Sequence, residues 1–199
     1  MSGHEAMTTA SGAAVAGYDE IVDLLANRES DQIPVRVTGC GVPVGEYAPA
    51  FVLPRGDDRS CGLADLMGAP FVLHFFSGAE DTWLRQSDCL KVVTPALAEL
   101  GVALVGIICA ERSQLRHLES VVKGYSLLLD WEPKALVSRI YGFNHTKASP
   151  GISATYLVDR RGVVRWIAFN GAEGRGDPSM ILNAARLHLT RPSTVDTSD

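Results

Sequence analysis

Four cysteines are the residues of this chain best suited to nucleophilic, redox or metal-binding chemistry. They are Cys40, Cys61, Cys89 and Cys109, separated by 21, 28 and 20 residues, and no two of them form a C-x-x-C pair. A zinc site normally draws its ligands from two close pairs, so this spacing does not predict a structural metal. Four cysteines among 199 residues are also too few for a disulfide-rich scaffold, and reduced thiols in a cytoplasmic protein are expected.

The composition is that of an ordinary globular protein with one core. Hydrophobic residues make up 46% of the chain, and the formal net charge is −5. A negative chain does not favour nucleic acid or an anionic membrane as a partner. No motif marks a nucleotide, metal or flavin site, so no cofactor is predicted. The first residues are not basic, and no apolar run approaches the ~18 residues of a membrane-spanning helix, so neither secretion nor membrane insertion is expected.

The chain divides into one domain and its flanking segments. Residues 1–12, rich in Ser, Thr, Gly and Ala, are predicted to be disordered. Residues 13–42 are expected to hold a short amphipathic helix and an irregular lead-in. The domain itself spans residues 43–190, and the polar tail over 191–199 is expected to be loose.

Within the domain, buried strands alternate with helices. Apolar runs predict a short strand over 51–53 and longer strands over 70–76, 102–108, 125–129, 154–159 and 163–169. Helical periodicity and capping signals predict helices over 82–100, with a kink at Pro95, and over 113–122, 133–141 and 177–189. Parallel βαβ units, then an antiparallel hairpin and a closing helix, predict an α/β, thioredoxin-like fold. This is a single domain with a central mixed sheet flanked by helices.

Five segments are similar, in the same order, to motifs of a known family. Residues 45–54 (GEYAPAFVLP) and 62–73 (GLADLMGAPFVL) are similar to its G-x-x-A-P-x-F-x-L-P and L-x-D-L-x-G-x-P-V-V-L motifs. The other three are its second parallel strand, its YG pair and its A-T-F-L-I-D-x-x-G-V-I-R motif, matched by residues 105–108, 141–142 and 154–165. Over residues 43–169 the chain therefore resembles the alkyl hydroperoxide reductase/thiol-specific antioxidant family of peroxiredoxin-like redoxins. The resemblance implies a thioredoxin fold of the peroxiredoxin type.

The resemblance fails at the positions that carry the family's chemistry. In the family a peroxidatic cysteine lies at the start of the helix after the first core strand. An ungapped alignment puts Leu84 at that position, and one insertion puts Arg85 there. The family's peroxide-binding arginine is replaced by Ser153. The active site is therefore interpreted as degenerate, and peroxidase activity is not carried over to this chain.

Asp81, at the predicted helix start, has two interpretations. As the N-cap of a helix from Thr82 onward, it would stabilise that helix by about 1 kcal/mol. Alternatively, its carboxylate acts as a base or orients a ligand in the former peroxide pocket. The first interpretation is favoured, because an environment that stabilises a carboxylate makes it a weaker base.

A small-molecule site is predicted at the helix start, because in this fold the loop that contains His145 approaches it. An acid, a base, a cation and an aromatic ring would then line one pocket. The catalytic candidates are Asp81, Arg85 and His145, and the substrate-binding candidates are Thr82, Trp83 and Ser153. His74, within the central strand, is interpreted as a core histidine whose hydrogen bonds are satisfied.

Cys89 offers a redox alternative. It lies five residues after Leu84, which is the spacing of the resolving cysteine in one peroxiredoxin subgroup. It also lies roughly 12 Å inside the helix, where the helix dipole no longer lowers the pKa of a thiol. Cys109 is interpreted as a core residue, and Cys40 and Cys61 as loop residues.

Two classes of function stay open. One is a non-redox enzyme, or a small-molecule-binding or scaffold protein, that uses the former peroxide pocket. The other is a thiol-dependent peroxidase or oxidoreductase that uses Cys89 or a loop cysteine. The expected partners are a small-molecule ligand and, by analogy with the family, a second copy in a homodimer. The sequence leaves open whether the chain is a catalyst.

Overall fold

A five-stranded mixed sheet forms the centre of the protein. The computed structural model describes residues 41–57, 59–77, 80–131, 135–142, 153–170 and 177–189. The sheet has the order β5-β4-β3-β6-β7, with the strands β3 (Phe71–Phe75), β4 (Ala103–Ile108), β5 (Ser126–Leu129), β6 (Ser153–Val158) and β7 (Val164–Asn170). β3, β4 and β5 are parallel, whereas β6 pairs antiparallel with both β3 and β7. The predicted α/β, thioredoxin-like arrangement is confirmed.

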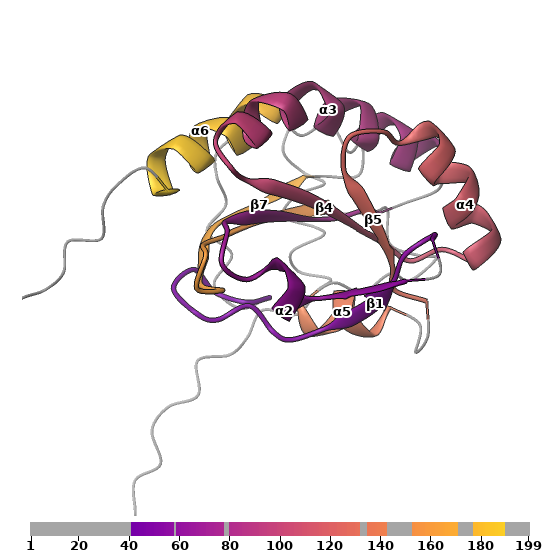
Figure 1. Cartoon of the computed structure of the whole chain (residues 1–199), viewed down its shortest axis with the longest axis horizontal. Helices are drawn as coiled ribbons and strands as arrows, with labels where there is room; N and C mark the ends of the chain where they lie inside the picture. Colours follow the sequence, from indigo (N-terminus) through magenta and orange to yellow (C-terminus); the bar gives the residue numbers. More distant parts are fainter. Residues whose placement is uncertain are drawn as a thin grey trace, which may run out of the picture.

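Long helices cover one face of the sheet, and short elements cover the other (Figure 1). The long helices are α3 (Glu80–Glu99), α4 (Arg112–Val121) and α6 (Pro178–Leu189). The other face carries α2 (Leu63–Leu66), α5 (Leu136–Ile140) and a small sheet of β1 (Val52–Pro54) and β2 (Ser60–Gly62). Each face of the main sheet therefore has its own hydrophobic core cluster.

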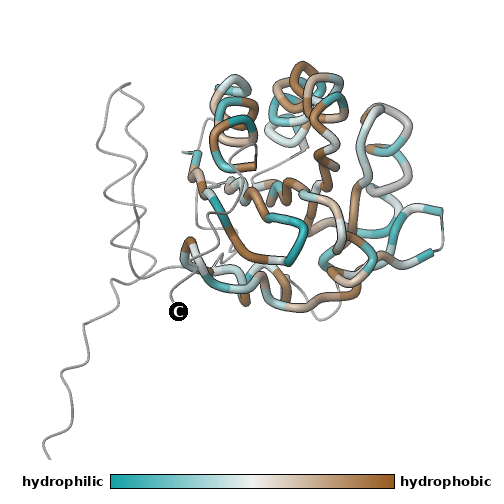
Figure 2. Tube along the Cα trace, turned by 60° about the vertical axis from the view of Figure 1, so that its left-hand side comes forward, coloured by the Kyte–Doolittle hydropathy of each residue, from teal (hydrophilic) through white to brown (hydrophobic). Residues whose placement is uncertain are grey.

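The central strand β3 fills both cores. All five of its residues are buried, because a central strand with both faces covered has no solvent side. Phe71, Leu73 and Phe75 pack in the cluster toward α2 and α5, whereas Val72 packs in the cluster toward α3 and α6. His74 is the polar member of the strand, and by the same alternation it faces α3 and α6. In Figure 2 the strands at the centre are mostly brown, and the helices alternate between brown and teal.

Some element boundaries differ from the sequence predictions. α3 begins at Glu80, two residues before the predicted start, and Pro95 lies inside it. α5 is shorter than the helix predicted over 133–141, part of which lies outside the described residues. The predictions for residues 1–40 and 191–199 lie outside them as well. None of the helices that the structure describes is both long and apolar enough to cross a membrane.

The predicted hairpin is confirmed as β6–β7, and Asp159 holds its turn. One carboxylate oxygen of Asp159 accepts hydrogen bonds from the backbone N–H groups of Arg161 (2.8 Å) and Val163 (3.0 Å). The other accepts hydrogen bonds from Arg165 Nε (2.8 Å) and Nη2 (2.7 Å). Burial acts to raise the pKa of Asp159, but these donors outweigh it and hold the pKa below its ordinary value. Gly162 completes the turn with a φ of +83°, which other residues rarely adopt.

A buried carboxylate joins β5 to α5. Asp130 directly follows β5, and only 1% of its surface is exposed. Its Oδ1 accepts a hydrogen bond from the backbone N–H of Val137 (3.1 Å), and its Oδ2 accepts one from that of Ser138 (2.7 Å). The carboxylate thus satisfies two donors in the first turn of the helix, which have no acceptor within the helix itself.

We expect Asp130→Ala to lower the free energy of unfolding by about 2–4 kcal/mol, because two buried N–H groups lose their acceptor. Chemical denaturation followed by circular dichroism measures the change. The matched control is Asp88→Ala, since the exposed Asp88 side chain forms an ion pair with Lys91 on the surface of α3. Loss of the Asp88 side chain should change the free energy of unfolding by less than about 0.5 kcal/mol. Equal stability of the two variants would contradict the capping role of Asp130.

His74 should make the stability of the protein depend on pH. Burial lowers the pKa of His74 from 6.5 to about 4, while the neighbouring Gln86 side chain acts in the opposite direction. Between these two values the unfolded chain takes up a proton that the folded chain does not. The contribution of neutral His74 to stability is therefore fully present above the pKa that His74 has in the unfolded chain. It is lost as the pH falls toward the pKa that His74 has in the folded chain. We expect a loss of up to about 3 kcal/mol over this range.

Denaturation of the wild type and His74→Phe at a series of pH values measures this contribution. The carboxylates titrate in both proteins, so the difference between the two profiles isolates His74. A His74→Phe profile parallel to that of the wild type would show that the imidazole is not held neutral.

Candidate functional site

The junction between β3 and α3 is held by a buried glutamine. Gln86 lies in α3 and is 1% exposed. Its Oε1 accepts a hydrogen bond from the backbone N–H of Ser77 (3.4 Å), and its Nε2 donates to the backbone oxygen (3.3 Å) and the hydroxyl (3.4 Å) of the same residue. Since Ser77 lies two residues after β3, Gln86 sets the position of α3 relative to the central strand.

The first turns of α3 expose several of the predicted site residues. Asp81 and Arg85 are exposed, and Arg85 Nη2 donates a hydrogen bond to Thr82 Oγ1 at 3.0 Å. Asp81 is the second residue of α3, so the prediction that it caps the helix is wrong. Within the first turn its carboxylate still interacts favourably with the helix dipole. Leu84 is half-buried and packs against the core cluster beneath the helix.

The other predicted site residues lie inside the protein. Trp83 is 8% exposed and belongs to the core cluster that also contains Val72 and Leu90. Ser153 is fully buried, and its Oγ accepts a hydrogen bond from Asn170 Nδ2 at 3.3 Å. His145 lies outside the described residues. The predicted candidates thus occupy different environments, and their shared role in ligand binding stays a prediction.

A pocket lies between the sheet and the two helices α3 and α6. Its cavity volume is about 20 Å³, within a hollow of about 380 Å³ that includes space open to solvent. Its polar lining residues are His74, Gln86, Cys89, Thr155, Asn170 and Asp177. The apolar lining includes Leu90, Trp166, Met180 and Ile181. Of the residues predicted to form a site, only Cys89 is part of this lining.

Most of this pocket was not predicted from the sequence, although local spacings could have indicated parts of its wall. Gln86, Cys89 and Leu90 follow the i, i+3, i+4 spacing of one helix face. Along β7, alternate residues from Trp166 to Asn170 point to the same face of the sheet. The pairing of β7 with β6, and of β6 with β3, is not visible in any local pattern.

His74 lies at the base of the pocket and is 3% exposed. Its Nδ1 lies 2.9 Å from Thr155 Oγ1, and its ring packs edge-on against Phe76 with 4.7 Å between the ring centres. Its Nε2 is buried and has no hydrogen-bond partner among the described residues. The prediction of a satisfied core histidine therefore holds for one ring nitrogen and is wrong for the other.

The three described cysteines lie in different surroundings. Cys89 is half-buried at the pocket, whereas Cys61 is buried in the core cluster on the opposite face of the sheet. Burial and, to a lesser extent, the Asp65 carboxylate raise the pKa of Cys61. Cys109 is half-buried, so the prediction of a core residue is wrong for it. Cys89 is thus the thiol that a small molecule in the pocket would meet.

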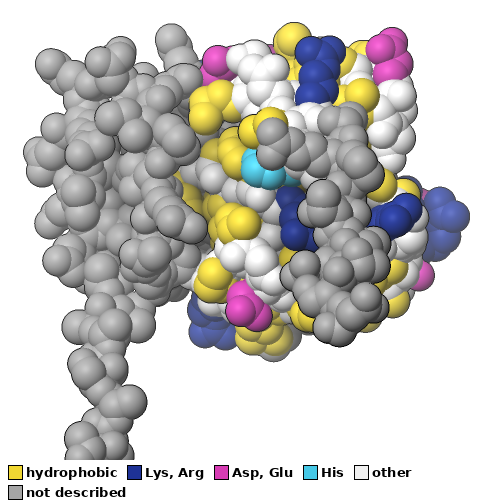
Figure 3. Space-filling view, turned by 90° about the vertical axis from the view of Figure 1, so that its left-hand side faces the viewer, with side chains coloured by type: hydrophobic (Ala, Val, Ile, Leu, Met, Phe, Trp, Pro, Cys, Tyr) yellow, Lys and Arg dark blue, Asp and Glu magenta, His cyan; other side chains and the backbone are white. Residues whose placement is uncertain are grey.

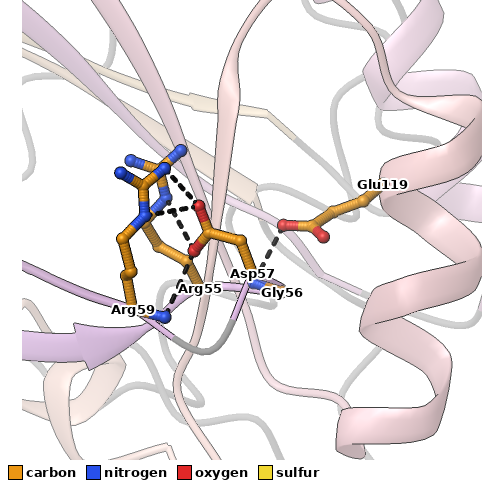
Figure 4. A network of polar contacts seen from close by, with 5 residues as sticks. All are labelled: Arg55, Gly56, Asp57, Arg59 and Glu119. Atoms are coloured by element: carbon orange, nitrogen blue, oxygen red, sulfur yellow. Dashed lines mark hydrogen bonds and ion pairs between the residues drawn. The ribbon is translucent and has the colours of Figure 1, made fainter.

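A second polar cluster surrounds the β1–β2 turn (Figure 4). Asp57 binds the guanidinium groups of Arg55 and Arg59, and Glu119 of α4 accepts a hydrogen bond from the backbone N–H of Gly56 at 3.0 Å. The Arg59 side chain, which donates to Asp57, lowers the pKa of this carboxyl group. Each side chain is already engaged within the cluster, so these contacts fasten the turn to α4 and do not form a binding site.

The described surface shows no concentration of charge on the face drawn in Figure 3. Hydrophobic side chains gather there, with basic and acidic side chains scattered among them. Within the described residues, no three His, Cys, Asp or Glu side chains are arranged to hold a metal ion. The pocket with His74 and Cys89 is therefore the strongest candidate site that the described structure contains.

Comparison with solved structures supports the fold. Peroxidoxin BcpB from Mycobacterium tuberculosis has a TM-score of 0.63 and 18% identity, over 75% of this chain and 98% of that chain. Enterococcus faecalis AhpC has a TM-score of 0.61 and 15% identity, over 72% of this chain and 92% of that chain. At these identities the likeness is one of architecture.

Sequence comparison gives the family. A Coxiella burnetii (strain RSA 493 / Nine Mile phase I) protein described as peroxiredoxin bcp is 26% identical over 132 residues, which cover 62% of this chain and 85% of that protein. The model of the AhpC/TSA family matches residues 44–167, from the segment before β1 into β7. With the sheet order and the two covered faces described above, this match shows that the chain belongs to the AhpC/TSA family of peroxiredoxin-like redoxins, within the thioredoxin-like superfamily.

Proposed function

We propose that this redoxin does not reduce peroxide at its helix start and instead uses the scaffold to bind a small molecule. The observation that carries the proposal is the composition of the first turns of α3. No cysteine lies between Glu80 and Asp88. An ungapped alignment with the family's motif puts Leu84 at the thiol position, and one insertion puts Arg85 there. A leucine that packs against the core offers neither a nucleophile nor a proton donor to a peroxide.

The position of Cys89 supports this proposal. A thiol becomes reactive at a helix start because the unpaired N–H groups and the dipole stabilise its thiolate. Cys89 is the tenth residue of α3, about 14 Å along the helix from its start at a rise of ~1.5 Å per residue. The effect of the dipole fades after the first turn, so the helix does not activate a thiol at this depth.

A second candidate function is a thiol oxidoreductase that uses Cys89. The observation in its favour is that Cys89 and His74 line the same pocket. The pKa of His74 argues against it, because an imidazole with a pKa of about 4 is a weak base at neutral pH. We therefore rank this function second.

The first test is oxidation by hydrogen peroxide. The fully reduced chain is mixed with a small excess of peroxide, and its intact mass is followed over time. We expect no rapid change, because no thiol lies at the helix start. A gain of one oxygen, or a loss of two hydrogens, within seconds would overturn the proposal.

The same measurement on Cys89→Ser tests the second candidate. We expect the wild type and Cys89→Ser to oxidise at the same slow rate. Cys61→Ala is the matched control, since Cys61 is buried on the opposite face of the sheet. Fast oxidation that Cys89→Ser abolishes and Cys61→Ala retains would establish the thiol oxidoreductase instead.

A further inference from the structure

We propose that the pocket between the sheet, α3 and α6 binds a small uncharged molecule whose hydroxyl group forms a hydrogen bond with His74 Nε2. This inference rests on the proposed binding function and adds to it the site and the chemical class of the ligand.

The base of the pocket is a row of three side chains across the sheet. His74 of β3 is paired with Thr155 of β6, which is paired in turn with Ala168 of β7. Paired residues of neighbouring antiparallel strands point to the same face, so this row faces α3 and α6. Ala168 is the smallest of the three, and its short side chain leaves room beside the Thr155–His74 hydrogen bond.

Nε2 of His74 is the polar atom with which we expect a ligand to form a hydrogen bond. It is buried and has no hydrogen-bond partner among the described residues, although buried polar atoms in proteins are nearly always bonded. The Nδ1–Thr155 hydrogen bond allows either tautomer, so Nε2 is either a donor or an acceptor. A hydroxyl group both donates and accepts, and it therefore suits Nε2 in either tautomer.

Several other polar groups of the pocket already form hydrogen bonds with the protein. The Gln86 amide bonds to Ser77, and Asn170 Nδ2 donates to Ser153. Asp177 accepts a hydrogen bond from the backbone N–H of Ser179 (2.8 Å). His74 Nε2, by contrast, is a buried atom of the lining with no hydrogen-bond partner among the described residues.

The charges at the pocket disfavour ionic ligands. His74 is neutral at pH 7, and Asp177 adds a carboxylate to the lining. An anion would meet a negative group and no cation among the described lining residues. An ammonium group would have to leave water without a buried carboxylate beside His74, which is unfavourable.

The size of the pocket suits a small ligand with one polar end. A cavity of about 20 Å³ accommodates a group the size of a water molecule or a hydroxyl. The wider hollow is lined by the apolar side chains of Leu90, Trp166 and Met180. A short alkyl chain attached to the hydroxyl would lie against these side chains.

The test is a titration of the full chain, labelled with nitrogen-15, with 1-butanol. The nitrogen resonances of the His74 ring report directly on a new hydrogen bond at Nε2. We expect a saturable shift of the Nε2 resonance. Butyrate, of similar size but charged, should bind at least roughly tenfold more weakly.

Three variants make the result specific. Ala168→Leu keeps His74 but fills the space beside Thr155, and it should abolish the saturable shift. His74→Phe should abolish binding as followed by the backbone amide signals of Gln86 and Cys89. His117→Gln, on the exposed side of α4, should bind 1-butanol as the wild type does.

The inference is overturned if 1-butanol causes no saturable shift at Nε2, if Ala168→Leu binds it as tightly as the wild type, or if butyrate binds equally well. The first outcome would mean that Nε2 is satisfied by solvent alone. Failure of the proposed function is a separate result: a chain that peroxide oxidises rapidly but that still binds 1-butanol would overturn that function and leave the pocket assignment intact.

Discussion

Burial of β3 on both faces is the constraint on which the rest of the structure depends. The strand is hydrogen-bonded to β4 on one side and to β6 on the other, and every one of its side chains is buried. Its phenylalanine and leucine side chains fill the core beneath α5, while Val72 fills the core beneath α3. Because side chains alternate, the imidazole ring of His74 has to lie on the side of the second core, where it is buried. The thioredoxin-like layers are the arrangement that covers both faces of this strand.

The burial of His74 has a consequence for chemistry. A buried imidazole is held neutral, because ionisation without water or a carboxylate partner costs several kcal/mol. Thr155 satisfies one ring nitrogen, and the edge of Phe76 packs against the ring. The other nitrogen lies at the base of a pocket that Ala168 keeps open and that α6 partly covers. The position of His74 Nε2 and the space beside it both follow from the register of β3, β6 and β7.

The same scaffold separates the helix start from the pocket. Gln86 ties α3 to Ser77, and the first turns of the helix bury Trp83 in the core while they expose Asp81 and Arg85. The next turn brings Cys89 over the sheet. Peroxiredoxin-like redoxins use the helix start because the dipole acts there. In this chain Cys89 of α3 lies beyond the first turn, where the effect of the dipole has faded. It lines the same pocket as the neutral His74. This geometry supports the proposal that the chain binds a small molecule instead of carrying out thiol chemistry.

Local sequence patterns determined most of the fold and the composition of the helix start. Apolar runs located the five main strands, helical periodicity located α3 and α6, and ordered motifs identified the family. They did not reveal β2, whose three residues form a strand only because β1 lies beside them. They also predicted Asp81 to be the N-cap of α3, although α3 already begins at Glu80. The pocket was decided by tertiary structure alone. Its base combines residues 74, 155 and 168, which are far apart in the chain and meet only through the pairing of β3, β6 and β7. Periodicity shows which face of a strand is buried, but register, which depends on contacts between distant segments, decides which side chains share that face.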